Sequence, residues 1–67
     1  MMEIKQDSGF LVFIMDGKEI YDIEIDQLQD PKLIAKWMKQ LSEKSWMRGY
    51  MHVFQSHVEA INSQDAA

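Results

Sequence analysis

The sequence contains no cysteine, which excludes disulfide bonds and metal sites built on thiolates. It has only three glycines, and they do not form a loop that could cradle a phosphate. No apolar run approaches the roughly 18 residues that a membrane-spanning helix needs. The N-terminal residues also lack the basic and apolar regions of a signal peptide. We therefore expect a soluble cytoplasmic protein that has no membrane contact and no cofactor.

Motifs for catalysis and metal binding are also missing. Ser56 and His57 are neighbours in the sequence, but adjacent residues of a helix do not face each other. His52 and His57 lie about 140° apart on a helix, whereas a metal-binding pair is normally four positions apart. A calcium loop counted from Asp22 lacks the glycine and the glutamate that the sixth and twelfth positions require. The sequence predicts no enzymatic activity, no metal and no small-molecule substrate.

The chain has 67 residues, enough for one small domain. Domains of this size often depend on a disulfide, a metal or a partner chain for stability. Because the sequence predicts neither a disulfide nor a metal site, it favours association with a partner protein or with a second copy of the chain. We expect a single domain over residues 1–62 and a flexible C-terminal tail over residues 63–67, which are small and polar.

A β-hairpin is predicted around Asp16 and Gly17, because this pair suits a type I′ turn between two alternating segments. A regular two-residue loop would pair Phe13 with Ile20. One side of the ribbon is then apolar along both strands, and we expect it to face the core. This first side consists of Phe10, Val12, Ile14, Tyr21, Ile23 and Ile25. Residues 2–5 could add a third strand.

The second side of the ribbon is apolar near the turn and acidic beyond it. It consists of Leu11, Phe13, Met15, Ile20, Asp22, Glu24 and Asp26. A bare patch of four large apolar side chains is uncommon on a stable monomer. We therefore predict that the second side binds a second copy or another protein, with the acids as a polar rim. The alternative is a solvated face whose charges prevent edge-to-edge aggregation.

Helical periodicity begins after Asp30, which can cap a helix, and Pro31, which suits its first position. An apolar stripe follows, formed by Leu33, Ile34, Trp37, Met38 and Leu41. A second helix is predicted over residues 45–62, with an apolar arc wide enough for two neighbours. One uninterrupted helix over residues 31–62 is the alternative. The expected fold is α+β, a β-hairpin or three-stranded antiparallel meander followed by two α-helices packed on one sheet face.

Charge is segregated along the chain, with −6 over residues 1–30 and +4 over residues 31–48. The basic segment suggests an alternative function, binding of nucleic acid through Lys32, Lys36, Lys39, Lys44 and Arg48. The net charge of −4 is opposite to the usual footprint of such proteins. The sequence therefore favours a small regulator or inhibitor that binds a larger protein. The prediction includes self-association of the chain as a homodimer. Its size, acidic strand and missing chemistry are typical of small modulators encoded by viruses or plasmids.

Overall fold

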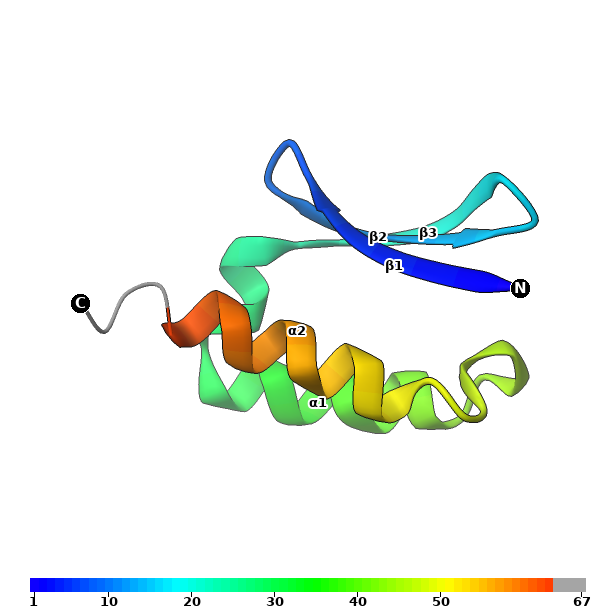
Figure 1. The fold of residues 1–67 in the computed structure, drawn as a ribbon. Coiled ribbons are helices and arrows are strands. Elements are labelled where there is room, and N and C mark those ends of the chain that lie inside the picture. Colours follow the sequence, from blue (N-terminus) through cyan, green and yellow to red (C-terminus); the bar gives the residue numbers. More distant parts are fainter. Residues whose placement is uncertain (64–67) are drawn as a thin grey trace.

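A computed structural model describes residues 1–63 of the chain. It has a three-stranded antiparallel sheet followed by two α-helices, as the sequence predicts (Figure 1). The elements in chain order are β1 (Met2–Asp7), β2 (Phe10–Met15), β3 (Lys18–Glu24), the 3-10 helix η1 (Ile25–Gln29), α1 (Pro31–Ser42), the 3-10 helix η2 (Ser45–Met47) and α2 (Met51–Ser63).

Two tight turns connect the strands. Asp16 and Gly17 have φ of 53° and 82°, the left-handed pair that a type I′ turn requires, so the predicted hairpin is confirmed. Ser8 and Gly9 repeat this geometry with φ of 53° and 86°. The third strand is therefore real, and it is longer than the predicted residues 2–5 because the turn uses only two residues.

The prediction of which side of the ribbon faces the helices is wrong. Leu11 and Phe13 of the second side are both 0% exposed and belong to the hydrophobic core. Phe10 of the first side is 38% exposed. The chain's own helices thus cover the side that we expected a partner to cover.

A β-bulge causes this reversal. Met15 pairs with Lys18 and Ile14 with Glu19, as in a regular hairpin, but Phe13 then pairs with Tyr21. Ile20 is the extra residue, and beyond it every β3 residue pairs one position later than expected. Because side chains alternate along a strand, this shift places the apolar residues of β3 on the same face as Leu11 and Phe13.

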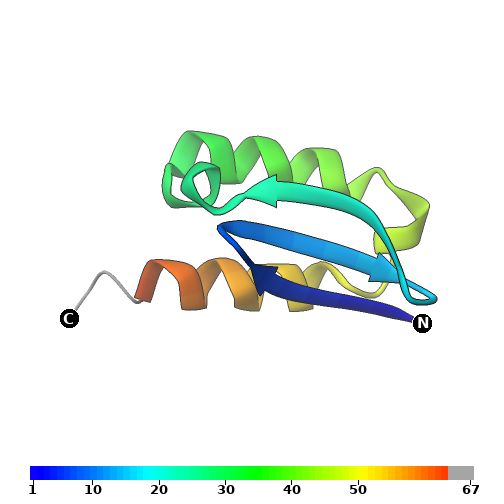
Figure 2. The ribbon, with the colours of Figure 1, turned by 90° about the horizontal axis from the view of Figure 1, so that it is seen from above.

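The two helices are separate and lie side by side beneath the sheet, so the single-helix alternative is wrong (Figure 1). The Asp30 carboxylate accepts a hydrogen bond of 2.9 Å from the Lys32 backbone N–H, which confirms the predicted cap. Figure 2 shows α1 on the β3 side of the sheet and α2 on the β1 side. Ser63 belongs to α2, and the rest of the predicted tail lies outside the described residues.

An aromatic cluster joins the sheet to the helices. The Phe13 ring lies 5.9 Å from Tyr21, 5.8 Å from Trp46 and 6.2 Å from Phe54, measured between ring centroids. The first two pairs are edge-to-face, an arrangement that adds about 0.5–1.5 kcal/mol to the burial of apolar area. One ring of β2 therefore contacts β3, η2 and α2 together.

Candidate functional site

The candidate site is the outer sheet face, the side of the sheet that none of the described helices covers. β2 contributes its apolar centre, and β1 and β3 contribute charged residues on either flank, as register and alternation place them. We define the outer sheet face by these residues: Phe10, Val12, Ile14, Ile20, Glu3, Lys5, Asp7, Glu19, Asp22 and Glu24.

The apolar centre of this face is a short stripe along β2. Phe10 and Ile20 are 38% and 40% exposed, and Ile14 is half-buried. Val12 is buried although it does not belong to the core cluster. Its cross-strand neighbours are Lys5 and Asp22, whose side chains flank it. The stripe therefore exposes apolar side chains at its two ends, whereas Val12 at its centre is covered by neighbouring side chains.

The rim around the stripe is acidic, because five carboxylates and one lysine give it a net charge of −4. The pKa of Glu19 is raised by a side-chain hydrogen bond with Asp22, by desolvation and by the negative charges of Asp22 and Asp7. Lys5 acts in the opposite direction. Glu19 thus lies close enough to Asp22 and Asp7 to interact with them, and a cation near these three carboxylates would relieve their repulsion.

The structure separates the predicted partner-binding residues into two groups. Leu11 and Phe13 are buried, and Met15 is half-buried against the core, so these three do not form an accessible patch. Ile20, Asp22 and Glu24 are exposed on or beside the outer sheet face. Asp26 is also exposed, but it lies in η1, beyond the end of the sheet.

Sequence reasoning missed Phe10, Ile14 and the charged residues of β1 as parts of this face. A usable signal was present in residues 2–7, where apolar Met2 and Ile4 alternate with charged Glu3 and Lys5. A two-residue turn at Ser8 and Gly9 places the apolar pair beside Phe13 and Met15. That pairing favours the observed core face, because only this face is apolar on both β1 and β2.

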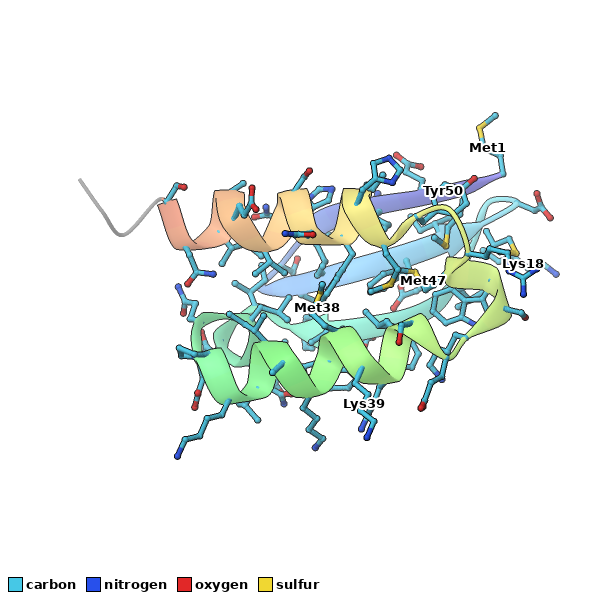
Figure 3. The ribbon with its side chains drawn as sticks, turned by 90° about the horizontal axis from the view of Figure 1, so that it is seen from below. Met1, Lys18, Met38, Lys39, Met47 and Tyr50 are labelled. Atoms are coloured by element: carbon cyan, nitrogen blue, oxygen red, sulfur yellow. The ribbon has the colours of Figure 1, made fainter. Side chains whose placement is uncertain are left out.

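The basic residues of the alternative function lie elsewhere. Lys32, Lys36 and Lys39 are exposed on α1, and Figure 3 shows Lys39 on the side of α1 that points away from α2. Lys44 is half-buried, and its ammonium lies 5.2 Å from the centroid of the Tyr21 ring, a cation–π contact. Arg48 is exposed beyond η2. The five residues therefore do not form one row along a single helix.

A shallow open groove of about 280 Å³ runs along α2, lined by His52, Val53, Ser56, His57 and Ala60. His57 is half-buried and His52 exposed. Residues 1–63 contain no group of three or more histidines or acidic residues placed to hold a metal ion. Within the same residues, no helix has the length and apolar character needed to cross a membrane.

No family model, curated protein or solved structure matches the chain.

Proposed function

We propose that the protein is a non-enzymatic interaction module that regulates a larger protein by docking the outer sheet face on it. The observation that carries this proposal is the combination of an apolar stripe and an acidic rim on one side of the three-stranded sheet. Protein interfaces commonly have such an apolar centre inside a polar rim. The partner surface that fits has apolar residues at its centre and lysine or arginine around them.

The acidic rim suggests how the module regulates its partner. A net charge of −4 on this face steers the protein toward basic surfaces and speeds their encounter. Many basic surfaces serve to bind phosphate-bearing ligands, so a protein docked there obstructs them. Inhibition by obstruction requires no pocket and no catalytic group in the module itself.

The proposal is tested by capturing partners from the source cell with wild type and with Phe10→Asp. Phe10 is exposed, so the substitution places a charge in the apolar stripe without opening the core. The matched control is Ala35→Asp, which adds the same charge at an exposed position of α1. We expect Phe10→Asp to lose the partner and Ala35→Asp to keep it. Equal recovery of the partner by Phe10→Asp would contradict the proposal.

Salt dependence and nucleic-acid binding give a second readout. Retention of the partner should weaken as salt rises, because salt screens the attraction between the acidic rim and the partner's basic surface.

For nucleic-acid binding, the test is titration with generic duplex DNA at low salt. We expect no binding, whereas an affinity that falls steeply with salt and is lost in Lys36→Glu would favour the alternative function.

A further inference from the structure

β1 is an edge strand of the sheet, and one of its two sides pairs with no other strand of the described chain. β1 pairs only with β2, and Figure 2 shows it along one side of the sheet with no other strand of the described chain beside it. An unprotected edge presents backbone N–H and C=O groups that can pair with another strand. Proteins often block such edges with a bulge, a proline or charged side chains. The described residues of β1 contain neither a bulge nor a proline.

The register of the β1–β2 hairpin defines which backbone groups are free. Asp7 and Phe10 close the two-residue turn, so they exchange hydrogen bonds with each other. Hydrogen-bonded and non-hydrogen-bonded positions alternate along an antiparallel pair. The backbone groups of Met2, Ile4 and Gln6 therefore point away from β2, toward the free edge.

A second β1 strand can satisfy these groups in an antiparallel arrangement with Ile4 on a two-fold axis. Ile4 then pairs with Ile4 of the second copy, and Met2 pairs with Gln6 of the second copy. All of these residues offer outward-pointing groups, so the ladder is complete over residues 2–6. The same alignment places Glu3 beside Lys5 of the second copy, and Lys5 beside its Glu3, on the outer sheet face.

The charges of the side chains favour this alignment over the alternative registers of the two β1 strands. A shift that puts Glu3 on the two-fold axis brings two glutamates together. The opposite shift brings two Lys5 side chains together and sets Glu3 beside Asp7 of the second copy. Like charges directly opposite each other destabilise a sheet. A further shift, centred on Gln6, pairs Lys5 with Asp7 but uses only the end of the strand, because Ile4 then faces the turn residue Ser8.

The other edge of the sheet lacks this complementarity. β3 carries the bulge at Ile20, which distorts the strand and its free edge. Its outer side carries Glu19, Asp22 and Glu24, all of the same sign. Two β3 edges would therefore repel each other, so β1 is the edge suited to self-association.

We propose that two copies of this chain form a homodimer by antiparallel pairing of their β1 strands, with Ile4 at the two-fold axis and reciprocal Glu3–Lys5 pairs. The dimer contains one continuous six-stranded sheet. Its two outer sheet faces lie side by side, so a dimer presents two apolar stripes to one partner. The backbone pairing uses the edge of the sheet, whereas Glu3 and Lys5 belong both to this interface and to the rim of the outer sheet face.

Charge reversal tests the pairing, with sedimentation velocity over a range of concentrations as the measurement. We expect wild type to dimerise. Glu3→Lys and Lys5→Glu should each raise the dissociation constant about tenfold or more, because the two-fold axis duplicates every like-charge pair. The double variant Glu3→Lys with Lys5→Glu should dimerise again. Monomeric wild type at every concentration, or a dimer that neither single reversal weakens, would overturn the proposal.

A backbone test separates edge pairing from other contacts. Gln6→Pro removes an outward N–H that the sheet itself does not use, and proline is tolerated at strand edges. Gln6→Thr keeps the N–H and is the matched control. Gln6→Pro should remain folded by circular dichroism and become monomeric, whereas Gln6→Thr should dimerise. A folded, dimeric Gln6→Pro would contradict β1 pairing, and unchanged partner capture by it would leave the docking face intact.

Discussion

Phe13 is the side chain on which the two layers of the molecule depend. It is fully buried, and its ring lies within about 6 Å of the rings of Tyr21, Trp46 and Phe54. Phe10, three positions earlier on the same strand, points to the opposite face and is 38% exposed. Two phenylalanines of one strand thus have different physical roles, since one holds the fold together and the other is available for contact.

Truncation of these two residues should separate the roles. We expect Phe13→Ala to lower the free energy of unfolding by about 3–5 kcal/mol, as for other buried phenylalanines. That loss is comparable with the total stability of a small domain, about 5–15 kcal/mol. Phe10→Ala should change it by about 1 kcal/mol or less, the range of substitutions on exposed strands. Urea denaturation measures both, and equal losses would contradict the assignment of the faces.

The interaction of Glu19 with Asp22 predicts a pH dependence. The pKa of Glu19 is raised, first by its hydrogen bond with Asp22, so the folded protein holds this proton more tightly than the unfolded chain. The contribution of Glu19 to stability is therefore fully present below about pH 4.5, its ordinary pKa, and is lost as pH rises through the raised value.

Removal of the charge should reverse this loss. At pH 7 we expect Glu19→Gln to be more stable than wild type, with a difference that shrinks as pH falls through the raised pKa of Glu19 and is gone below about pH 4.5. Asp22→Asn should give a similar gain, and the double variant should be less stable than the sum of the two gains implies, because both remove one repulsion. Thermal unfolding at several pH values measures this, and fully additive gains would refute the coupling.

At the scale of elements, the bulge in β3 determines which face of the sheet meets the helices. Without it, Tyr21 and Ile23 would lie across from the outer residues of β2. With it, they join Leu11 and Phe13 on the core side, and Ile23 is 2% exposed. Ile20, the inserted residue, does not belong to the core cluster. The bulge therefore allows a two-residue turn while the apolar residues of both strands lie on the same face of the sheet.

Deletion of Ile20 should consequently be tolerated. A one-residue deletion in a strand normally moves every following side chain to the other face. Here it removes the extra residue and leaves Tyr21 opposite Phe13 in a regular hairpin. We expect the variant to fold and to keep the near-UV circular dichroism of its packed aromatic rings. Deletion of Ile14 is the control, because it turns Met15 to the opposite face, and it should destabilise the protein more. A reversed order would contradict the role of the bulge.

At the scale of the whole molecule, the end of α2 closes the domain. The Asn62 side chain donates hydrogen bonds to the backbone carbonyls of Leu28, at 2.9 Å, and Val58, at 2.8 Å. Leu28 lies in η1, which links the sheet to α1, and is fully buried. The last turn of the last helix thus holds the junction between the two layers, across 34 positions of sequence.

Asn62→Ala tests this closure. We expect it to lower the free energy of unfolding by about 0.5–1.5 kcal/mol, the net worth of a typical hydrogen bond. Gln55→Ala is the control, because its side chain is exposed and makes only a 3.5 Å contact with Glu59. If α2 and the sheet unfold together, tryptophan fluorescence and far-UV circular dichroism will report the same loss. A change confined to the helical signal would indicate that the end of α2 unfolds independently.

The local signals of the sequence determined the elements of this protein. Asp-Gly between alternating segments produced the hairpin, Asp30 and Pro31 began α1, and helical periodicity placed Leu41, Phe54 and Val58 in the core. These features depend on backbone preferences and on residues close in the chain. Only the tertiary structure decided which face of β2 is buried, and so which residues form the candidate site. Both faces of that strand are apolar, and the choice between them required β1, the bulge and the helices together, because burial of the greater apolar area is a property of the assembled layers.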